Sequence, residues 1–368
     1  MVKAFLKYLI YALAAKIVFI ILFLNLAPQF GSNPTLSQMR YYDTFDNYTD
    51  GSFKCVEQTP MMTGEISTWD FFTNHKSRRP DKTIEPKHIN YSQFREIGSE
   101  KYKIAWLGHS AFIININGKI ILLDPMLGTH AAPIAIPNLR RYSNLALELD
   151  SILKIDMVII SHDHYDHLDH FTINKIKDDV RLFIVPHGVG NHLKKWKIPV
   201  DKITEMNWGE NFVEDEIVIR CLESRHFSGR GPFNRNSTLW SSWAINSTSV
   251  NIYFSGDSGY GKHLKKIGDR YGPFDISLID CGQYNKAWKY SHMFPHEAVL
   301  GALDLRTQYF MPIHWGGFTL AMHSWDEPVL ESIESASLLG LKYFTPEIGE
   351  IVTDKTIGNS LTNWWENY

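Results

Sequence analysis

Residues 161–169 read Ser-His-Asp-His-Tyr-Asp-His-Leu-Asp and follow directly on an apolar run at 157–160. The potential metal ligands in this cluster are His162, His164, Asp166 and His167. Period-2 geometry points the first two histidines to one side of an extended segment, and the other two ligands fall on the following turn. A buried strand that ends in imidazoles and a carboxylate can hold two cations side by side. The alternative is a solvated histidine-rich loop, but such loops rarely carry three histidines and a carboxylate at this spacing.

Candidate ligands also follow the carboxyl ends of three later predicted strands: His226, Asp257 and His314. His292 lies in a loop before a helix predicted near His296. Any one of these residues, taken alone, is more often a cap or a turn residue. Convergent strand ends form a shared mouth where ligands can meet. In this order after the cluster at 161–169, they therefore indicate a single site.

Apolar runs from residue 103 onwards predict strands at 104–107, 112–116, 119–123, 156–160, 182–185, 217–222, 239–245, 250–255, 276–279 and 309–312. Helices are predicted from Leu168 and near 189–196, 261–270, 296–303 and 327–339. Asn117-Gly118 between two of the strands predicts a tight hairpin. Strand meanders mixed with helices favour sheets whose outer faces are covered by helices.

The N-terminus differs in kind from the rest of the chain. Residues 4–27 are mostly apolar, and a helix of this length would span about 36 Å, enough for a bilayer. An uncleaved membrane anchor at 1–27 is the favoured interpretation, with a signal peptide and an interfacial amphipathic helix as alternatives. The lysines cluster at the N-terminal end, so the positive-inside rule places the rest of the chain outside the cytoplasm, on the periplasmic side.

The domain layout predicted beyond the anchor has three parts. Residues 28–100 are polar and irregular, and we expect a tether and an N-terminal wrap there. The main folded domain is predicted at 101–350, followed by a C-terminal tail at 351–368. A hydrophobic content of 44% is that of a folded globule, and a net charge of −3 argues against nucleic acid as a partner. Three cysteines far apart define neither a disulfide framework nor a cysteine-based zinc site.

Several sequence words together resemble the metallo-β-lactamase fold superfamily, and within it the N-acyl-phosphatidylethanolamine-hydrolysing phospholipase D group. Besides the cluster at 161–169, the matching words are Trp106-Leu107-Gly108-His109-Ser110, Leu123-Asp124-Pro125, Leu239-Trp240-Ser241-Ser242-Trp243, Gly256-Asp257-Ser258-Gly259-Tyr260, residues 267–275, Gly282-Gln283-Tyr284 and Ile313-His314-Trp315-Gly316. The resemblance covers roughly residues 75–345. It implies an α+β fold, a four-layer αββα sandwich, with the membrane helix added at the N-terminus.

The resemblance implies a dinuclear zinc site, with iron or manganese as alternative metals. It assigns one ion to His162, His164 and His226. It assigns the other ion to Asp166, His167 and His314, with Asp257 bridging the two. Asp124 is expected to orient a ligand histidine, and His109 either does the same or only packs.

The implied reaction is hydrolysis of a phospholipid phosphodiester to phosphatidic acid and an N-acylethanolamine. Two zinc ions about 3.5–4 Å apart would lower the pKa of a water towards roughly 7. Asp166, Asp257 and His292 are the expected catalytic residues, with His292 binding the scissile group or acting as an acid. His296 stands where the family usually has an acidic residue, and Asn285-Lys286-Ala287 also differs, which leaves the headgroup preference open.

The expected partners are a phospholipid substrate and the membrane, and a homodimer is left open. One alternative function is a hydrolase of the same fold that acts on a sugar-phosphate lactone or an acyl ester. Another is a membrane-tethered binding protein without activity, which would predict missing ligands. None of the implied ligands is missing from the sequence.

Overall fold

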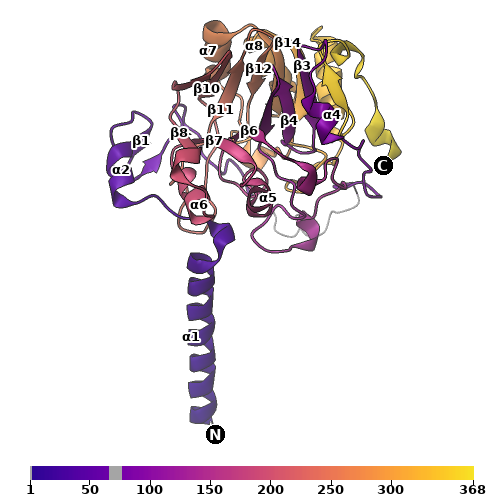
Figure 1. Ribbon diagram of the computed structural model, residues 1–368. Helices are drawn as coiled ribbons and strands as arrows, with labels where there is room; N and C mark the ends of the chain where they lie inside the picture. The colour runs from indigo at the N-terminus through magenta and orange to yellow at the C-terminus, as the bar shows by residue number, and fades with distance from the viewer. Residues whose placement is uncertain (1, 66–76) are drawn as a thin grey trace.

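The computed structural model describes residues 2–65 and 77–368. Two β-sheets pack face to face, and helices cover their outer faces (Figure 1). Most buried apolar side chains belong to one continuous core, which extends from Ile84 to Trp365. This arrangement confirms the predicted α+β sandwich.

The larger sheet has seven strands. In spatial order they are β15 (Ile351–Thr353), β3 (Tyr102–Trp106), β4 (Phe112–Ile116), β5 (Lys119–Leu123), β6 (Ile155–Ile159), β7 (Val180–Pro186) and β8 (Ile203–Met206). The pairs from β15 to β5 are antiparallel, and the pairs from β5 to β8 are parallel. Because β5 and β6 are parallel, their carboxyl ends lie at the same edge of the sheet.

The second sheet has six strands. In spatial order they are β14 (Thr307–Ile313), β13 (Phe274–Asp280), β12 (Asn251–Phe254), β11 (Ser242–Asn246), β10 (Ile217–Leu222) and β9 (Asn211–Glu214). The strands β12, β13 and β14 are parallel, and β11 is antiparallel to both β10 and β12. The carboxyl ends of β10, β12, β13 and β14 therefore share one edge.

Helices form the two outer layers. The helices α8 (Pro295–Asp304) and α9 (Glu327–Leu338) pack on the six-stranded sheet, with α7 (Lys262–Tyr271) beside α8. The helix α6 (Gly190–Lys195) packs against β8 of the seven-stranded sheet, and α5 (His170–Ile176) lies on the same side (Figure 1).

The N-terminal helix α1 (Val2–Leu26) projects away from the sandwich (Figure 1). By length and composition, its residues from Lys3 to Leu26 are apolar enough to cross a membrane, and none of them is buried in the domain. A short 3₁₀ turn, Pro28–Phe30, joins it to the domain.

The segment after this turn wraps around the domain. It contains α2 (Leu36–Tyr42), the short hairpin of β1 (Tyr48–Thr49) and β2 (Ser52–Phe53), and α4 (Tyr91–Arg95). Its side chains Tyr42, Tyr48 and Phe53 form a small separate core with Leu239 and Trp240. The aromatic residues of this region thus contribute to packing.

The last eighteen residues are integrated into the domain, whereas we expected a tail from residue 351. The strand β15 extends the seven-stranded sheet beside β3. Trp364 and Trp365 are buried against Trp315 in the main core. Burial of two indole side chains stabilises a terminus that the sequence alone shows only as a short polar stretch.

Candidate metal centre

The two sheet edges meet where the predicted ligands lie. The cluster at 161–169 follows β6, and Asp124 follows the parallel neighbour β5. From the other sheet, His226 follows β10, Asp257 follows β12 and His314 directly follows β14. The structure thus brings all seven predicted ligands together in the space between the sheets.

Three imidazoles form the first donor set, which we call the trihistidine set: His162, His164 and His226. Nδ1 of His164 lies 2.8 Å from Nε2 of His162 and 3.3 Å from Nε2 of His226. One nitrogen of each ring and one carboxylate oxygen of Asp257 all lie within 4.8 Å of one another. Converging imidazole nitrogens of this kind match the ligand sets that bind zinc.

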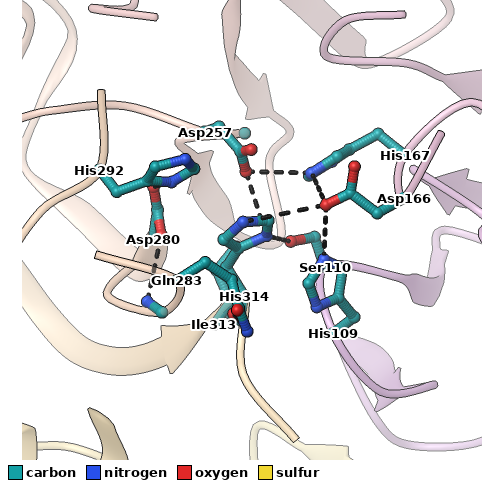
Figure 2. Close-up of polar contacts among 12 residues, drawn as sticks. His109, Ser110, Asp166, His167, Asp257, Asp280, Gln283, His292, Ile313 and His314 are labelled. Atoms are coloured by element: carbon teal, nitrogen blue, oxygen red, sulfur yellow. Dashed lines mark hydrogen bonds and ion pairs between the residues drawn. The ribbon is translucent and has the colours of Figure 1, made fainter. Parts of the chain in front are cut away.

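The second donor set consists of Asp166, His167 and His314. Oδ2 of Asp166 lies 3.4 Å from Nε2 of His167 and 3.9 Å from Nε2 of His314. Figure 2 shows the neighbours Asp166 and His167 converging with His314 from the other sheet, with His109 beside them. His109 also has one ring nitrogen within the same 4.8 Å cluster of donors.

Asp257 stands between the two sets, and each of its carboxylate oxygens faces a different one. Oδ2 is 3.6 Å from Nε2 of both His162 and His226. Oδ1 is 3.0 Å from Nε2 of His167 and 3.2 Å from Nδ1 of His314 (Figure 2). A single carboxylate is therefore placed to join two neighbouring cation sites.

The donor chemistry of the site fits divalent cations. His167 lies among three carboxylates, those of Asp124, Asp166 and Asp257. Among the described residues, Nε2 of His167 and Oδ1 of Asp257 are buried and have no hydrogen-bond partner. Buried polar atoms without partners are costly, and a cation between them would satisfy both while offsetting the negative charge.

The ionisation states also suit metal binding. Burial holds the pKa values of His162, His226 and His314 well below the ordinary value, so these imidazoles are neutral and have a free lone pair. Burial opposes ionisation of Asp257 as well, but the surrounding histidines, His167 first among them, together outweigh burial and keep the pKa of this carboxyl well below its usual range. His167 differs from the other three histidines, because its three neighbouring carboxylates raise its pKa despite burial, and a cation bound there would replace its proton.

Neighbouring side chains hold the candidate ligands in place. Oδ2 of Asp124 accepts from Nδ1 of His167 at 2.7 Å, which leaves Nε2 facing the site. Nε2 of His109 lies 2.9 Å from Oδ2 of Asp166, and Oγ of Ser110 lies 3.1 Å from Nδ1 of His314. Asp124 thus contacts a ligand histidine, as expected from the sequence. His109 was expected either to orient a ligand or only to pack, and its contact with Asp166 favours the orienting role.

Asp124→Asn is expected to weaken zinc binding by about 10–100-fold, because an amide cannot accept from His167 with the strength of a carboxylate. The measurement is equilibrium competition with a coloured chelator. Asp156→Asn is the matched control, since Asp156 accepts from the amide of Ile120 at 2.8 Å in the same sheet but does not contact the site. Equal zinc affinity of the two variants would contradict an orienting role for Asp124.

His292 lies at the edge of the centre and is paired with a carboxylate that the sequence did not single out. Nδ1 of His292 is 2.9 Å from Oδ2 of Asp280, the last residue of β13. The imidazole of His292 stacks on that of His314, with ring centroids 5.1 Å apart. Burial disfavours the imidazolium, but the charge and hydrogen bond of Asp280, together with the charges of Asp257 and Asp166, raise the pKa of His292 above its ordinary value. Burial raises the pKa of Asp280 itself to about 7, so the two groups share a proton near neutral pH.

A signal for Asp280 was present in the sequence. It ends a buried apolar strand, as Asp124 does after β5, and strand ends also supply the other site residues. The pairing of β13 with β12 and β14 brings this carboxylate to the site beside His292, and that pairing could not be read from the sequence.

The sequence around these ligands also matches a known protein family. Residues 119–315 match the model of the beta-lactamase superfamily domain, which is more than half of the chain. The chain belongs to the metallo-β-lactamase superfamily. With the donor set described above, it is a metallo-hydrolase of this fold.

Three relatives show how far the similarity extends. An uncharacterized protein of Mycobacterium tuberculosis is 37% identical over 328 residues, which cover 87% of each chain. The N-acyl-phosphatidylethanolamine-hydrolyzing phospholipase D 1 of Caenorhabditis elegans is 34% identical over 267 residues, covering 67% of this chain and 74% of the relative. The solved structure of Igni18, a metallo hydrolase of Ignicoccus hospitalis, is 22% identical with a TM-score of 0.51 and covers 68% of this chain and 97% of that one.

Proposed function

We propose that this protein is a membrane-anchored dinuclear zinc hydrolase that cleaves a phosphodiester bond of phospholipids in the manner of a phospholipase D. The observation that carries the proposal is the position of Asp257, whose two oxygens face two separate donor sets. Its ligands would be the trihistidine set for one ion and Asp166, His167 and His314 for the other. The similarity to the phospholipase of Caenorhabditis elegans supports N-acyl-phosphatidylethanolamine as the substrate.

When bound, two zinc ions would supply Lewis acidity and make water nucleophilic near neutral pH. The side chains around them have their own tasks. Asp257 fixes the separation of the two donor sets, and Asp124 and His109 keep His167 and Asp166 oriented. The raised pKa of His292 favours the imidazolium, which would donate its proton to the scissile phosphate or to the departing alcohol oxygen.

The surroundings of the site suit a lipid phosphate. A cavity of about 220 Å³ adjoins His226. Lys54 and Arg235 contribute two positive charges to its wall against the one negative charge of Glu57, and Met61 and Phe227 contribute apolar surface. The loop before Arg235 also forms a hollow together with the end of α1, so this wall lies towards the proposed anchor. A substrate with a phosphodiester and acyl chains requires this combination of charge and apolar surface.

The proposed topology has α1 in the bilayer and the catalytic domain on the extracytoplasmic side. The charges of the helix, Lys3, Lys7 and Lys16, lie in its N-terminal two thirds, which supports a cytoplasmic N-terminus. Protease accessibility of the domain in sealed vesicles of known orientation tests this proposal. Protection of the domain in right-side-out vesicles would overturn the orientation.

The substrate test uses the full chain in detergent micelles, with zinc content measured on the same sample. N-acyl-phosphatidylethanolamine, a sugar-phosphate lactone and an acyl ester are offered in water enriched in ¹⁸O. The expected result is about two zinc ions per chain and ¹⁸O in the phosphate of phosphatidic acid, because attack occurs at phosphorus. Hydrolysis of the lactone or of the ester alone would overturn the lipase proposal. Less than about one zinc per chain after gentle purification would favour a non-catalytic binding protein.

A further inference from the structure

We propose that the segment leaving α1, residues 28–32, is a built-in support of the metal-binding loop, and that Arg230 and His192 are the positioning residues that join the two. The inference rests on the proposed metal site but not on the identity of the substrate. Figure 1 shows the end of α1 meeting the domain beside α6, which carries His192.

Arg230 forms the first connection. Its Nη1 donates to the carbonyls of Asp163 and Leu168 at 2.6 and 2.8 Å. These two carbonyls bracket the loop that carries His164, Asp166 and His167. On its other edge, Nε and Nη2 both donate to the carbonyl of Gln29, at 3.0 and 2.8 Å. One guanidinium therefore clamps both ends of the ligand loop and holds the juxtamembrane segment.

Arg230 is a buried cation, so losing one of its hydrogen-bond acceptors would cost free energy. The side chain is only 2% exposed, and its guanidinium lies 4.1 Å from the ring of Tyr165, which belongs to the ligand loop. Cation–π contact and four hydrogen bonds compensate for the burial of its charge. Release of Gln29 would leave Nε and Nη2 buried without that acceptor, which is costly for a charged donor.

His192 forms the second connection. Its Nδ1 accepts from the amide of Ser32 at 2.9 Å, so its Nε2 carries the proton and donates to Oδ2 of Asp163 at 3.2 Å. The same carboxylate accepts from Thr238 at 3.0 Å and from the amide of Gly229 at 2.7 Å. Asp163 stands between the ligands His162 and His164, so the amide of Ser32 is linked through one imidazole to the ligand loop.

Further contacts fix the path of the segment. Trp196 donates from Nε1 to the carbonyl of Pro28 at 2.7 Å, and Lys195 donates to the carbonyl of Gly31 at 2.6 Å. Gly31 has a φ of +68°, and a Cβ there would collide with the ring of His192. Glycine at position 31 is thus required both by the backbone conformation and by the close approach to His192.

Reciprocity allows a test in the unmodified full chain. If the segment supports the loop, zinc bound at the loop must stabilise the segment by the same coupling free energy. Amide hydrogen exchange with and without zinc is the measurement. We expect zinc to slow exchange at Ser32 and its neighbours as well as at 162–168. Slower exchange at 162–168 with no change at 28–33 would overturn the proposal.

A substitution within residues 28–32 tests the connection, and a second glycine provides its control. Gly31→Ala is expected to weaken zinc binding by about tenfold or more and to speed exchange at 163–168, although residue 31 contacts no ligand. Gly340→Ala is the matched control, because Gly340 has the same φ of +68° but has nothing within 4 Å of its Cβ position. Equal zinc affinity and equal exchange at 163–168 in the two variants would overturn the proposal.

Arg230→Lys keeps the positive charge but loses the planar guanidinium, whose nitrogens donate to Gln29 and to the ligand loop at the same time. We expect faster exchange at 28–32 and weaker zinc binding, also by about tenfold. Arg95→Lys is the control, since Arg95 donates to the carbonyls of Leu153 and Lys154 and lies over Tyr91, away from the site. Both readouts are independent of turnover, so failure of the substrate proposal would leave this result interpretable. If amide exchange at 28–32 is the same in Arg230→Lys and in Arg95→Lys, Arg230 does not hold the segment.

Discussion

Asp257→Asn is expected to lower kcat by at least about 10³-fold. The substitution removes a charge that both donor sets share, while the side chain keeps its shape. Transition-state stabilisation by a metal pair amounts to several kcal/mol, and each 1.36 kcal/mol corresponds to a factor of ten in rate. Zinc content should fall in parallel, since the bridging oxygen contributes to both sites. The measurements are kcat with the best substrate and zinc per chain on the same preparation.

The fold should survive this change, because asparagine keeps the shape of Asp257 and the residue lies in a loop after β12, outside the apolar core. Thermal unfolding of the zinc-free proteins checks this, and Asp269→Asn is the control, since Asp269 is exposed and pairs with Lys265 on the surface. Activity within about tenfold of the parent would contradict the role assigned to Asp257.

Sequence patterns located the strands well where the apolar run was bounded by turns. The strands β4, β5 and β10 have the predicted ends, and the hairpin at Asn117-Gly118 is confirmed with φ values of 54° and 79°. The strands β8 and β9 were not predicted. Both are only partly buried, so their alternation of apolar and polar side chains is weak. The three-residue edge strand β15 is too short to give a pattern of its own.

The site was predicted from residue types and order together with the family resemblance, and an orienting role for Asp124 was predicted as well, but the supports of the ligand loop were not. That His226, Asp257 and His314 follow strand ends was visible, and the common edge of the sheets explains why they meet. The supports of the ligand loop involve partners far away in the sequence. His192 contacts Ser32 over 160 positions, and Arg230 contacts Gln29 over 201. Such contacts have no spacing signature, because the fold and not the local sequence brings the partners together.

The placement of these supports has a consequence for how the site relates to the membrane. The turn after α1 contacts the same residues that clamp the ligand loop, so the loop cannot move far from the end of the proposed anchor without breaking those contacts. With α1 in the bilayer, as proposed above, the ligand loop would stay at a fixed distance from the bilayer surface. An enzyme whose substrate resides in the bilayer benefits from such a fixed distance, because less of the lipid needs to leave the membrane.

His292→Ala is expected to lower kcat by about 10²–10⁴-fold, the range for loss of a positioned general acid. Nδ1 of His292 lies 2.9 Å from Oδ2 of Asp280, and this contact raises the pKa of the imidazole beside the donor sets. If the proton goes to the departing alcohol, a phosphodiester with a nitrophenolate leaving group should lose much less activity than N-acyl-phosphatidylethanolamine, because nitrophenolate departs without protonation. The measurement is the ratio of kcat between parent and variant for the two substrates.

Zinc content separates this role from metal binding. We expect His292→Ala to keep the zinc content of the parent, since the two donor sets do not include His292, and a loss of zinc would show that it is a ligand. His88→Ala is the control, because His88 is exposed and belongs to neither donor set. An equal loss on both substrates with zinc intact would assign His292 to binding the phosphate. Asp280→Asn should then reproduce part of the loss, because the amide no longer holds the charge on the imidazole.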